Sequence, residues 1–104
     1  MKEIKIDLNA ANNKQLNESY LGWFGDAIKL LMRRIFGEVD IPVQVSGTES
    51  QIRSFARALE GERRYMDSFR RYGLDDPRTY RDRAHLEQAV SGFERATSIK
   101  WPFK

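Results

Sequence analysis

The sequence predicts a small α+β domain of order β-α-β-α-α, with a short two- or three-stranded sheet and three helices. Residues 4–8 and 41–45 alternate apolar and other residues with the period of two typical of strands that bury one face. Three longer stretches repeat apolar residues at three- and four-residue steps, as one side of a helix does, and they cover residues 16–35, 49–72 and 77–96. No linker or low-complexity stretch interrupts the chain, so we expect residues 1–104 to form one domain.

The two strands are expected to pair in parallel, because a helix connects them and such crossovers join parallel neighbours. Pro42 cannot donate to a strand ladder, which places it at a free edge or before the second strand begins. A two-stranded sheet is marginal by itself. The C-terminal stretch Ile99–Lys104 again alternates apolar residues with others, so it is expected to form a short edge strand or a docked tail.

The first helix, over residues 16–35, is apolar around most of its circumference and should end at Gly37. Gly22 and Gly25 lie inside it, where each weakens a helix by up to about 1 kcal/mol relative to alanine. One interpretation is a central helix packed on two sides. The other is a helix that forms part of an oligomer interface, where the glycines allow a second backbone to come close.

The second helix has a clear start signal, because Thr48 and Gln51 have the spacing of a capping box. Beyond Gly61 the apolar side of this helix turns by roughly a quarter of the circumference. The helix therefore either bends at Gly61 or packs its second half against another surface. The apolar residues of that second half are Tyr65, Met66, Phe69 and Tyr72.

Arg63 and Arg70 fall where the first half of this helix would point into the core. Long basic side chains commonly lay their methylene groups over a core and carry the charge to its rim. The alternative is a buried ion pair of these arginines with Glu62 or with Asp75 and Asp76.

The third helix should begin at Pro77 with Asp76 as its N-cap. A second start signal, Thr79-x-x-Asp82, lies just inside. The expected buried stripe consists of Leu86, Ala89, Val90, Phe93 and Ala96.

The strongest local pattern is an arginine ridge on the second helix, defined by Arg53, Arg57, Arg64 and Arg71 and bordered by Tyr65 and Tyr72. Arginines and tyrosines in this arrangement can neutralise phosphates and stack on bases, so an anionic partner, either a nucleic acid or an acidic protein, is one interpretation. Glu60 and Asp67 lie four residues before Arg64 and Arg71. Such spacing favours the other interpretation, a solvated surface of ordinary intrahelical ion pairs.

Composition excludes most catalytic designs. The chain has no cysteine and a single histidine, His85, for which the sequence supplies no orienting partner. Asp75 and Asp76 precede Pro77 and are explained by helix capping. We therefore expect no enzyme activity, no catalytic or metal-ligating residues and no cofactor. The charged start of the chain resembles neither a signal peptide nor a membrane span, so a cytoplasmic location without membrane contact is expected.

Trp101 and Phe103 form a candidate interaction tail, because aromatic residues near a chain end are unfavourable unless they are docked. They can dock on the protein's own core or wait for a partner. The leading functional hypothesis is a small non-enzymatic protein-interaction module that self-associates or binds another protein. The alternative is a nucleic-acid-binding accessory protein that uses the arginine ridge.

Overall fold

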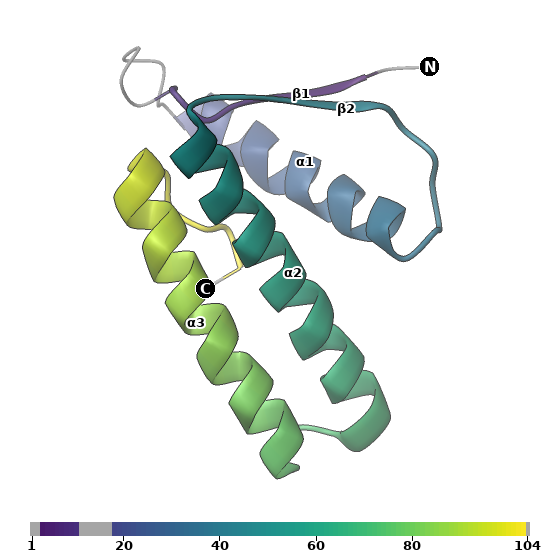
Figure 1. The fold of residues 1–104 in the computed structure, drawn as a ribbon. Coiled ribbons are helices and arrows are strands. Elements are labelled where there is room, and N and C mark those ends of the chain that lie inside the picture. Colours follow the sequence, from purple (N-terminus) through teal and green to yellow (C-terminus); the bar gives the residue numbers. More distant parts are fainter. Residues whose placement is uncertain (1–2, 11–17, 104) are drawn as a thin grey trace.

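The computed structural model describes residues 3–10 and 18–103, and its element order is β-α-β-α-α, as predicted (Figure 1). The strands β1 and β2 lie beside α1, and the long helices α2 and α3 form an antiparallel hairpin (Figure 1). The bounds of the elements are Ile4–Asp7 for β1, Glu18–Ile35 for α1, Val43–Ser46 for β2, Glu49–Tyr72 for α2 and Pro77–Thr97 for α3.

The strands pair in parallel, with Ile4 opposite Val43 and Ile6 opposite Val45. Ile4 and Ile6 are buried and Lys5 is exposed, so the sheet turns its apolar face to the helices. The second strand begins directly after Pro42, whose carbonyl oxygen accepts a hydrogen bond from the Ile4 amide at 2.8 Å. Proline thus starts the strand without breaking its ladder.

The C-terminal stretch is a docked tail and not a strand, and among the described residues the sheet has two strands. Ser98 adopts a left-handed conformation (φ 61°, ψ 15°) at the end of α3 and turns the chain back toward α1. The backbone amide of Trp101 then donates to a Glu94 carboxylate oxygen at 2.8 Å. That amide is therefore not available for a strand ladder, and the side chains of Ile99 and Trp101 are buried.

The core lies where the sheet, α1, the first half of α2, the second half of α3 and the tail meet. Its centre is an aromatic cluster in which Phe93 lies 6.1 Å from Phe24, 5.7 Å from Phe55 and 5.2 Å from Trp101, measured between ring centroids. All four rings are buried. Because the tail supplies one of these rings, the core is complete only when the tail is docked.

Helix α1 packs into this core mainly through Phe24, Ile28 and Leu31, whereas Leu21 and Trp23 near its start are exposed. A Cβ atom at Gly25 would meet Pro102 of the tail at 3.5 Å, an ordinary contact. At Gly22 a Cβ atom would meet nothing within 4 Å. No second chain is present, so the oligomer interpretation of these glycines stays a prediction. Leu16 lies outside the described residues.

The capping box at the start of α2 is confirmed: the Thr48 hydroxyl accepts from the Gln51 amide, and the Gln51 side chain accepts from the Thr48 amide. The helix continues through Gly61 without interruption. A Cβ atom at Gly61 would lie 3.2 Å from Leu86 Cα, so the glycine lets the backbone of α3 come close at this point. Past this contact the second half of α2 has surroundings different from those of the first half. Of the two predicted alternatives, a bend at Gly61 or a change of packing surface, the structure shows the change of packing surface.

Helix α3 begins as predicted. The Asp76 side chain accepts a hydrogen bond from the Arg78 amide, and Pro77 is the first helical residue. Within the expected stripe Leu86, Val90 and Phe93 are buried, while Ala89 and Ala96 are partly exposed.

Candidate functional site

The arginine ridge is largely compensated by its own helix. The Arg53, Arg64 and Arg71 side chains lie 2.6, 2.9 and 3.6 Å from Glu49, Glu60 and Asp67, each carboxylate being four residues earlier. All of these groups are well exposed, so each pair contributes only about 0.3 to 0.5 kcal/mol. In the described part of the chain Arg57 makes no ion pair. The ridge therefore exists as a surface, and three of its four charges are matched locally.

The two tyrosines that were predicted to border the ridge have separate surroundings. Tyr65 is half-buried and lines a cleft between α2 and α3. Tyr72 is exposed, and the Arg78 guanidinium carbon lies 3.5 Å from its ring centroid. The arginine stacked on Tyr72 thus comes from α3 and not from the ridge.

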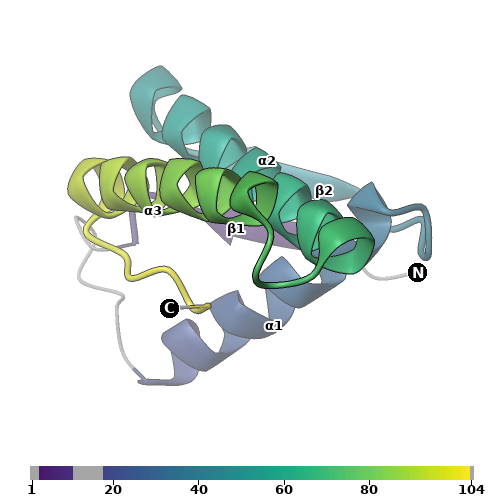
Figure 2. The same cartoon turned by 90° about the horizontal axis from the view of Figure 1, so that it is seen from below.

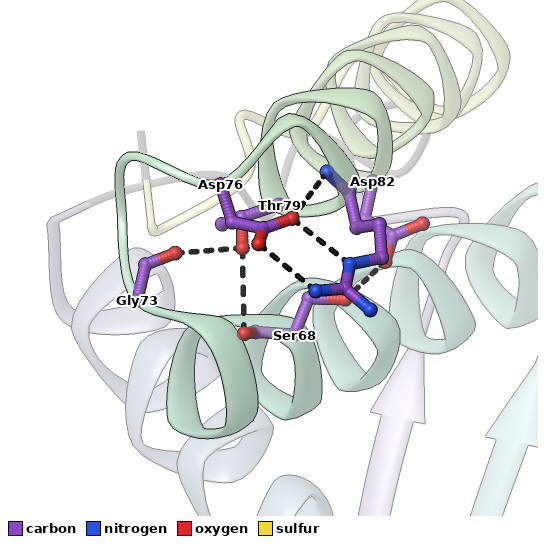
Figure 3. Close-up of polar contacts among 6 residues, drawn as sticks. Ser68, Gly73, Asp76, Thr79 and Asp82 are labelled. Carbon is purple, nitrogen blue, oxygen red and sulfur yellow. Dashed lines mark hydrogen bonds and ion pairs between the residues drawn. The ribbon is translucent and has the colours of Figure 1, made fainter.

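The distal half of the α2–α3 hairpin, residues 63–85, has a polar interior (Figure 3). The buried residues of this segment are Ser68 and Thr79. The Ser68 hydroxyl donates to Asp82, and the Thr79 hydroxyl donates to the Gly73 carbonyl oxygen at 2.7 Å. The sequence pattern Thr79-x-x-Asp82 therefore joins the two helices and is not a second helix start, because Asp76 already caps α3.

Large apolar side chains of the same segment point outward. We define the hairpin tip as Phe69, Tyr72, Leu74 and Tyr80, whose exposed fractions lie between 39% and 55%. The sequence predicts Phe69 and Tyr72 on the apolar side of the helix. That side has little to pack against at this level, because α3 meets α2 here through hydroxyl and carboxylate groups.

The segment that carries the tip also carries the net charge of the chain. Residues 63–85 contain seven arginines and four aspartates, a net charge of +3, which equals the formal net charge of the whole sequence. Arg78 and Asp76 are mutually bonded at 3.0 Å, and this arginine lowers the pKa of Asp76 to about 2. The hairpin tip is thus an apolar surface in a basic setting.

Arg63 and Arg70 are both exposed and make no ion pair within residues 3–10 and 18–103. The buried-ion-pair interpretation is therefore wrong for both, because neither side chain is buried and Asp76 is bonded to Arg78 instead. The Arg70 guanidinium carbon lies 4.8 Å from the ring centroid of Phe36. This contact agrees with the other interpretation, in which arginine covers apolar surface and keeps its charge in water.

Glu62, which the sequence suggests as a buried ion-pair partner of Arg63 or Arg70, contacts the C-terminal tail instead, and sequence reasoning missed this candidate site. Glu62 is 6% exposed, and one carboxylate oxygen accepts a hydrogen bond from the Trp101 indole nitrogen at 2.8 Å. Burial raises the pKa of Glu62, and the hydrogen bond from Trp101 partly offsets that effect. The sequence signal was weak: Glu62 lies four residues from Ala58 and Met66 on the core side of α2.

Two clefts meet at Glu62 and Phe103. The first, between α1 and α2, has a volume of about 300 Å³, and the second, between α2 and α3, about 710 Å³. In the predicted interaction tail Trp101 is 3% exposed and sits in the core, whereas Phe103 is 39% exposed and lines both clefts. The two tail aromatics thus have different surroundings.

His85 is exposed on α3. Over residues 3–10 and 18–103, no three histidine, cysteine, aspartate or glutamate side chains gather closely enough to hold a metal ion. In the same residues no helix combines the length and the hydropathy needed to cross a membrane. The chain matches no protein-family model, no curated protein and no solved structure.

Proposed function

We propose that this protein is a non-enzymatic protein-interaction module that binds an acidic, partly apolar surface of another protein through the hairpin tip. The observation that supports the proposal is the inverted distribution of residues in the distal hairpin, where hydroxyl groups are buried and large apolar side chains are exposed. We further propose a cytoplasmic location, because a chain without cysteine needs no oxidising compartment.

The polar interior of the distal hairpin matters for this function. Ser68, Thr79 and Asp82 hold the two helices together without help from the exposed apolar residues, so the tip is formed before a partner arrives. A preformed surface binds more tightly, because little conformational freedom is lost on association. Exposed aromatic side chains are the typical anchors of protein interfaces.

Charge selects among partners. The net charge of +3 on residues 63–85 attracts an acidic surface and increases the association rate at low salt. Two copies of the same basic segment repel each other, which makes self-association through the tips the less favourable form of the same function. Phe69 and Leu74 supply the apolar contact, and the surrounding arginines supply orientation.

The test compares tip and control variants as immobilised baits in an extract of the native cells. The triple variant Phe69→Ser, Leu74→Ser, Tyr80→Ser should lose at least about ten-fold of one retained acidic protein, measured by quantitative mass spectrometry, since each buried apolar side chain contributes about 1.5 to 3 kcal/mol. The matched control Ile52→Ser, an exposed apolar residue near the start of α2, should retain it. Identical retained proteins for both variants would contradict the proposal.

Light scattering on the purified chain separates the two forms of the function. A partner-binding module should have the mass of one chain across the micromolar range. A dimer of the parent chain that is lost in the triple tip variant, but kept in Ile52→Ser, would show that the tip binds a second copy of this chain and not a different protein.

A second candidate function, nucleic-acid binding through the arginine ridge, is favoured by the net charge of the distal hairpin and by Arg57, which has no ion pair with any residue that the structure describes. It predicts that a single-stranded oligonucleotide binds at about 50 mM salt, with an affinity that falls by roughly 50-fold by 200 mM salt when each of the four ridge arginines neutralises one phosphate. The variant Arg57→Ala, Arg64→Ala, Arg71→Ala should reduce the salt slope by about two. Fluorescence anisotropy measures both quantities, and the absence of binding at low salt would exclude this function.

A further inference from the structure

The cleft between α1 and α2 has apolar walls and a graded polarity along its length. On α2, Glu62, Met66 and Arg70 follow one another at four-residue steps and so lie on one side of the helix. From Glu62 to Arg70 the helix rises by about 12 Å. A carboxyl group therefore stands at one end of the cleft, a methionine in its middle and a guanidinium group at the other end.

Helix α1 and the tail supply the opposite wall. Phe36 contacts Arg70 at the cationic end, Met32 is buried along the wall, and Phe103 lies with Glu62 at the other end. Figure 2 shows α1 and the tail on the same side of the hairpin, which is the side where this cleft lies. Methionine and phenylalanine side chains adapt well to an alkyl chain.

Within the described part of the chain, the cationic end holds one guanidinium group without a carboxylate partner and one that is paired. Arg70 makes no ion pair among the described residues, and its guanidinium lies over the Phe36 ring. Lys29, Arg33 and Glu38 also line the cleft, and Arg33 lies 3.4 Å from Glu38. Over the residues that the structure describes, Arg70 and Lys29 therefore supply its unmatched positive charge. A guanidinium group held beside an apolar surface is well suited to bind a carboxylate.

We propose that the α1–α2 cleft binds a free medium-chain monocarboxylate, with the carboxylate at Arg70 and Arg33 and the alkyl chain along Met32 and Met66. Charge complementarity at one end and apolar walls along the rest select this class of ligand. The volume of about 300 Å³ is at the lower end of the range for small-molecule sites. This inference is independent of the protein-interaction function, since it uses none of the tip residues.

Glu62 sets the expected upper limit of chain length. An alkyl chain that extends from Arg70 along α2 reaches the Glu62 carboxyl group after about 12 Å. Glu62 is buried and Trp101 donates to one of its oxygens, so a polar group that an alkyl chain cannot satisfy interrupts the apolar wall at the point where the α2–α3 cleft begins. Affinity should therefore rise with each methylene up to about decanoate, by at most about four-fold per step, and should not rise further.

The experiment is a titration of the full chain with hexanoate, octanoate, decanoate and dodecanoate below their micelle concentrations, followed by calorimetry. A parallel titration uses Trp101 fluorescence in the variant Trp23→Phe, which leaves Trp101 as the only tryptophan. Decanoate should bind and change the Trp101 emission, because Glu62 and Phe103 contact both the tryptophan and the cleft. Arg70→Gln should weaken binding at least about ten-fold.

The matched control is Arg63→Gln, which removes another exposed arginine of the same helix that has no ion pair among the described residues and lies outside the cleft. It should leave the affinity unchanged, and circular dichroism should show both variants folded. Four results would overturn the proposal: no binding of decanoate, equal binding of decanol, equal losses in Arg63→Gln and Arg70→Gln, or binding to anionic phospholipid vesicles without binding to monomeric decanoate. A Trp101 emission that changes when the protein is diluted without ligand would show that a second copy of the chain occupies the cleft. This result would also overturn the proposal.

Discussion

Replacing Trp101 with alanine is expected to lower the free energy of unfolding by about 3 to 5 kcal/mol. The indole is 3% exposed, packs edge-on against Phe93 at 5.2 Å, and lies 6.2 Å from Phe55. Its loss leaves a cavity between the tail and the hairpin. It also leaves the buried Glu62 carboxylate without its indole donor, which adds to the penalty.

Urea unfolding followed by far-ultraviolet circular dichroism measures this effect, because the spectrum follows the helices and not the missing tryptophan. The control is Phe103→Ala, whose ring is 39% exposed and which should cost about 1 kcal/mol or less. A Trp101→Ala variant as stable as the parent chain would mean that the tail is not part of the folded core.

Replacing Glu62 should have opposite effects according to what replaces it. Alanine removes the acceptor of the Trp101 indole hydrogen and should destabilise the protein by about 1 to 3 kcal/mol. Glutamine keeps a carbonyl oxygen for the indole and removes the buried negative charge. At pH 7 Glu62→Gln should therefore be at least as stable as the parent chain, as measured by the same urea unfolding.

The pH dependence of this difference has a definite sign. The pKa of Glu62 is raised in the folded state above its ordinary value of 4.5, so the folded protein binds the proton more tightly than the unfolded chain. The stability of the parent chain relative to Glu62→Gln should thus decrease as the pH rises from 4.5 through the folded-state pKa, and should be constant above it. A relative stability that rises with pH over this range would contradict the assignment. Asp76, with its lowered pKa of about 2, acts in the opposite sense below its ordinary value of 3.8, and its effect cancels in the comparison because both proteins contain it.

Local sequence patterns predicted the elements well because each depends on near neighbours. Thr48 and Gln51 mark the start of α2, Asp76 and Pro77 mark the start of α3, and the alternation around Ile4 and Val43 marks the strands. Parallel pairing also followed from the sequence, since the connection through a helix restricts the topology.

The arrangement of the hairpin could not be read in the same way. Periodicity assigns Phe69 and Tyr72 to an apolar side, but it does not tell how far the opposing helix continues with apolar residues. The part of α3 opposite this level of α2 presents Thr79 and Asp82. Their side chains bond to Ser68 over 11 and 14 positions of the sequence, a polar contact that only the three-dimensional pairing reveals. The sequence likewise marks Gly61 as the point where α2 either bends or changes its packing surface. Only the structure shows the reason for a glycine there, since a Cβ atom would lie 3.2 Å from Leu86 Cα.

The candidate site residues show the same difference between local contacts, which the sequence predicts, and long-range contacts, which it does not. The ion pairs of the arginine ridge were predictable, because residues four apart on one helix meet whatever the fold. Glu62 and Trp101 are 39 positions apart and meet only when the tail folds back over α2. This contact depends on the left-handed backbone conformation of Ser98. Glycine is the residue that usually adopts this conformation, so a serine gives no sequence signal for such a turn.

The parallel strand pair has a consequence for the order of folding. Ile4 and Val43 are separated in the sequence by the whole of α1. Bringing them together therefore closes a long loop, which costs chain entropy before any hydrogen bond between the strands forms. The antiparallel helices α2 and α3 are joined by a short turn and can associate with a much smaller loss. We infer that the α2–α3 hairpin forms early in folding and that the strand pair closes last. Slow folding of this small chain would then come from the pairing of β1 with β2, its two shortest elements.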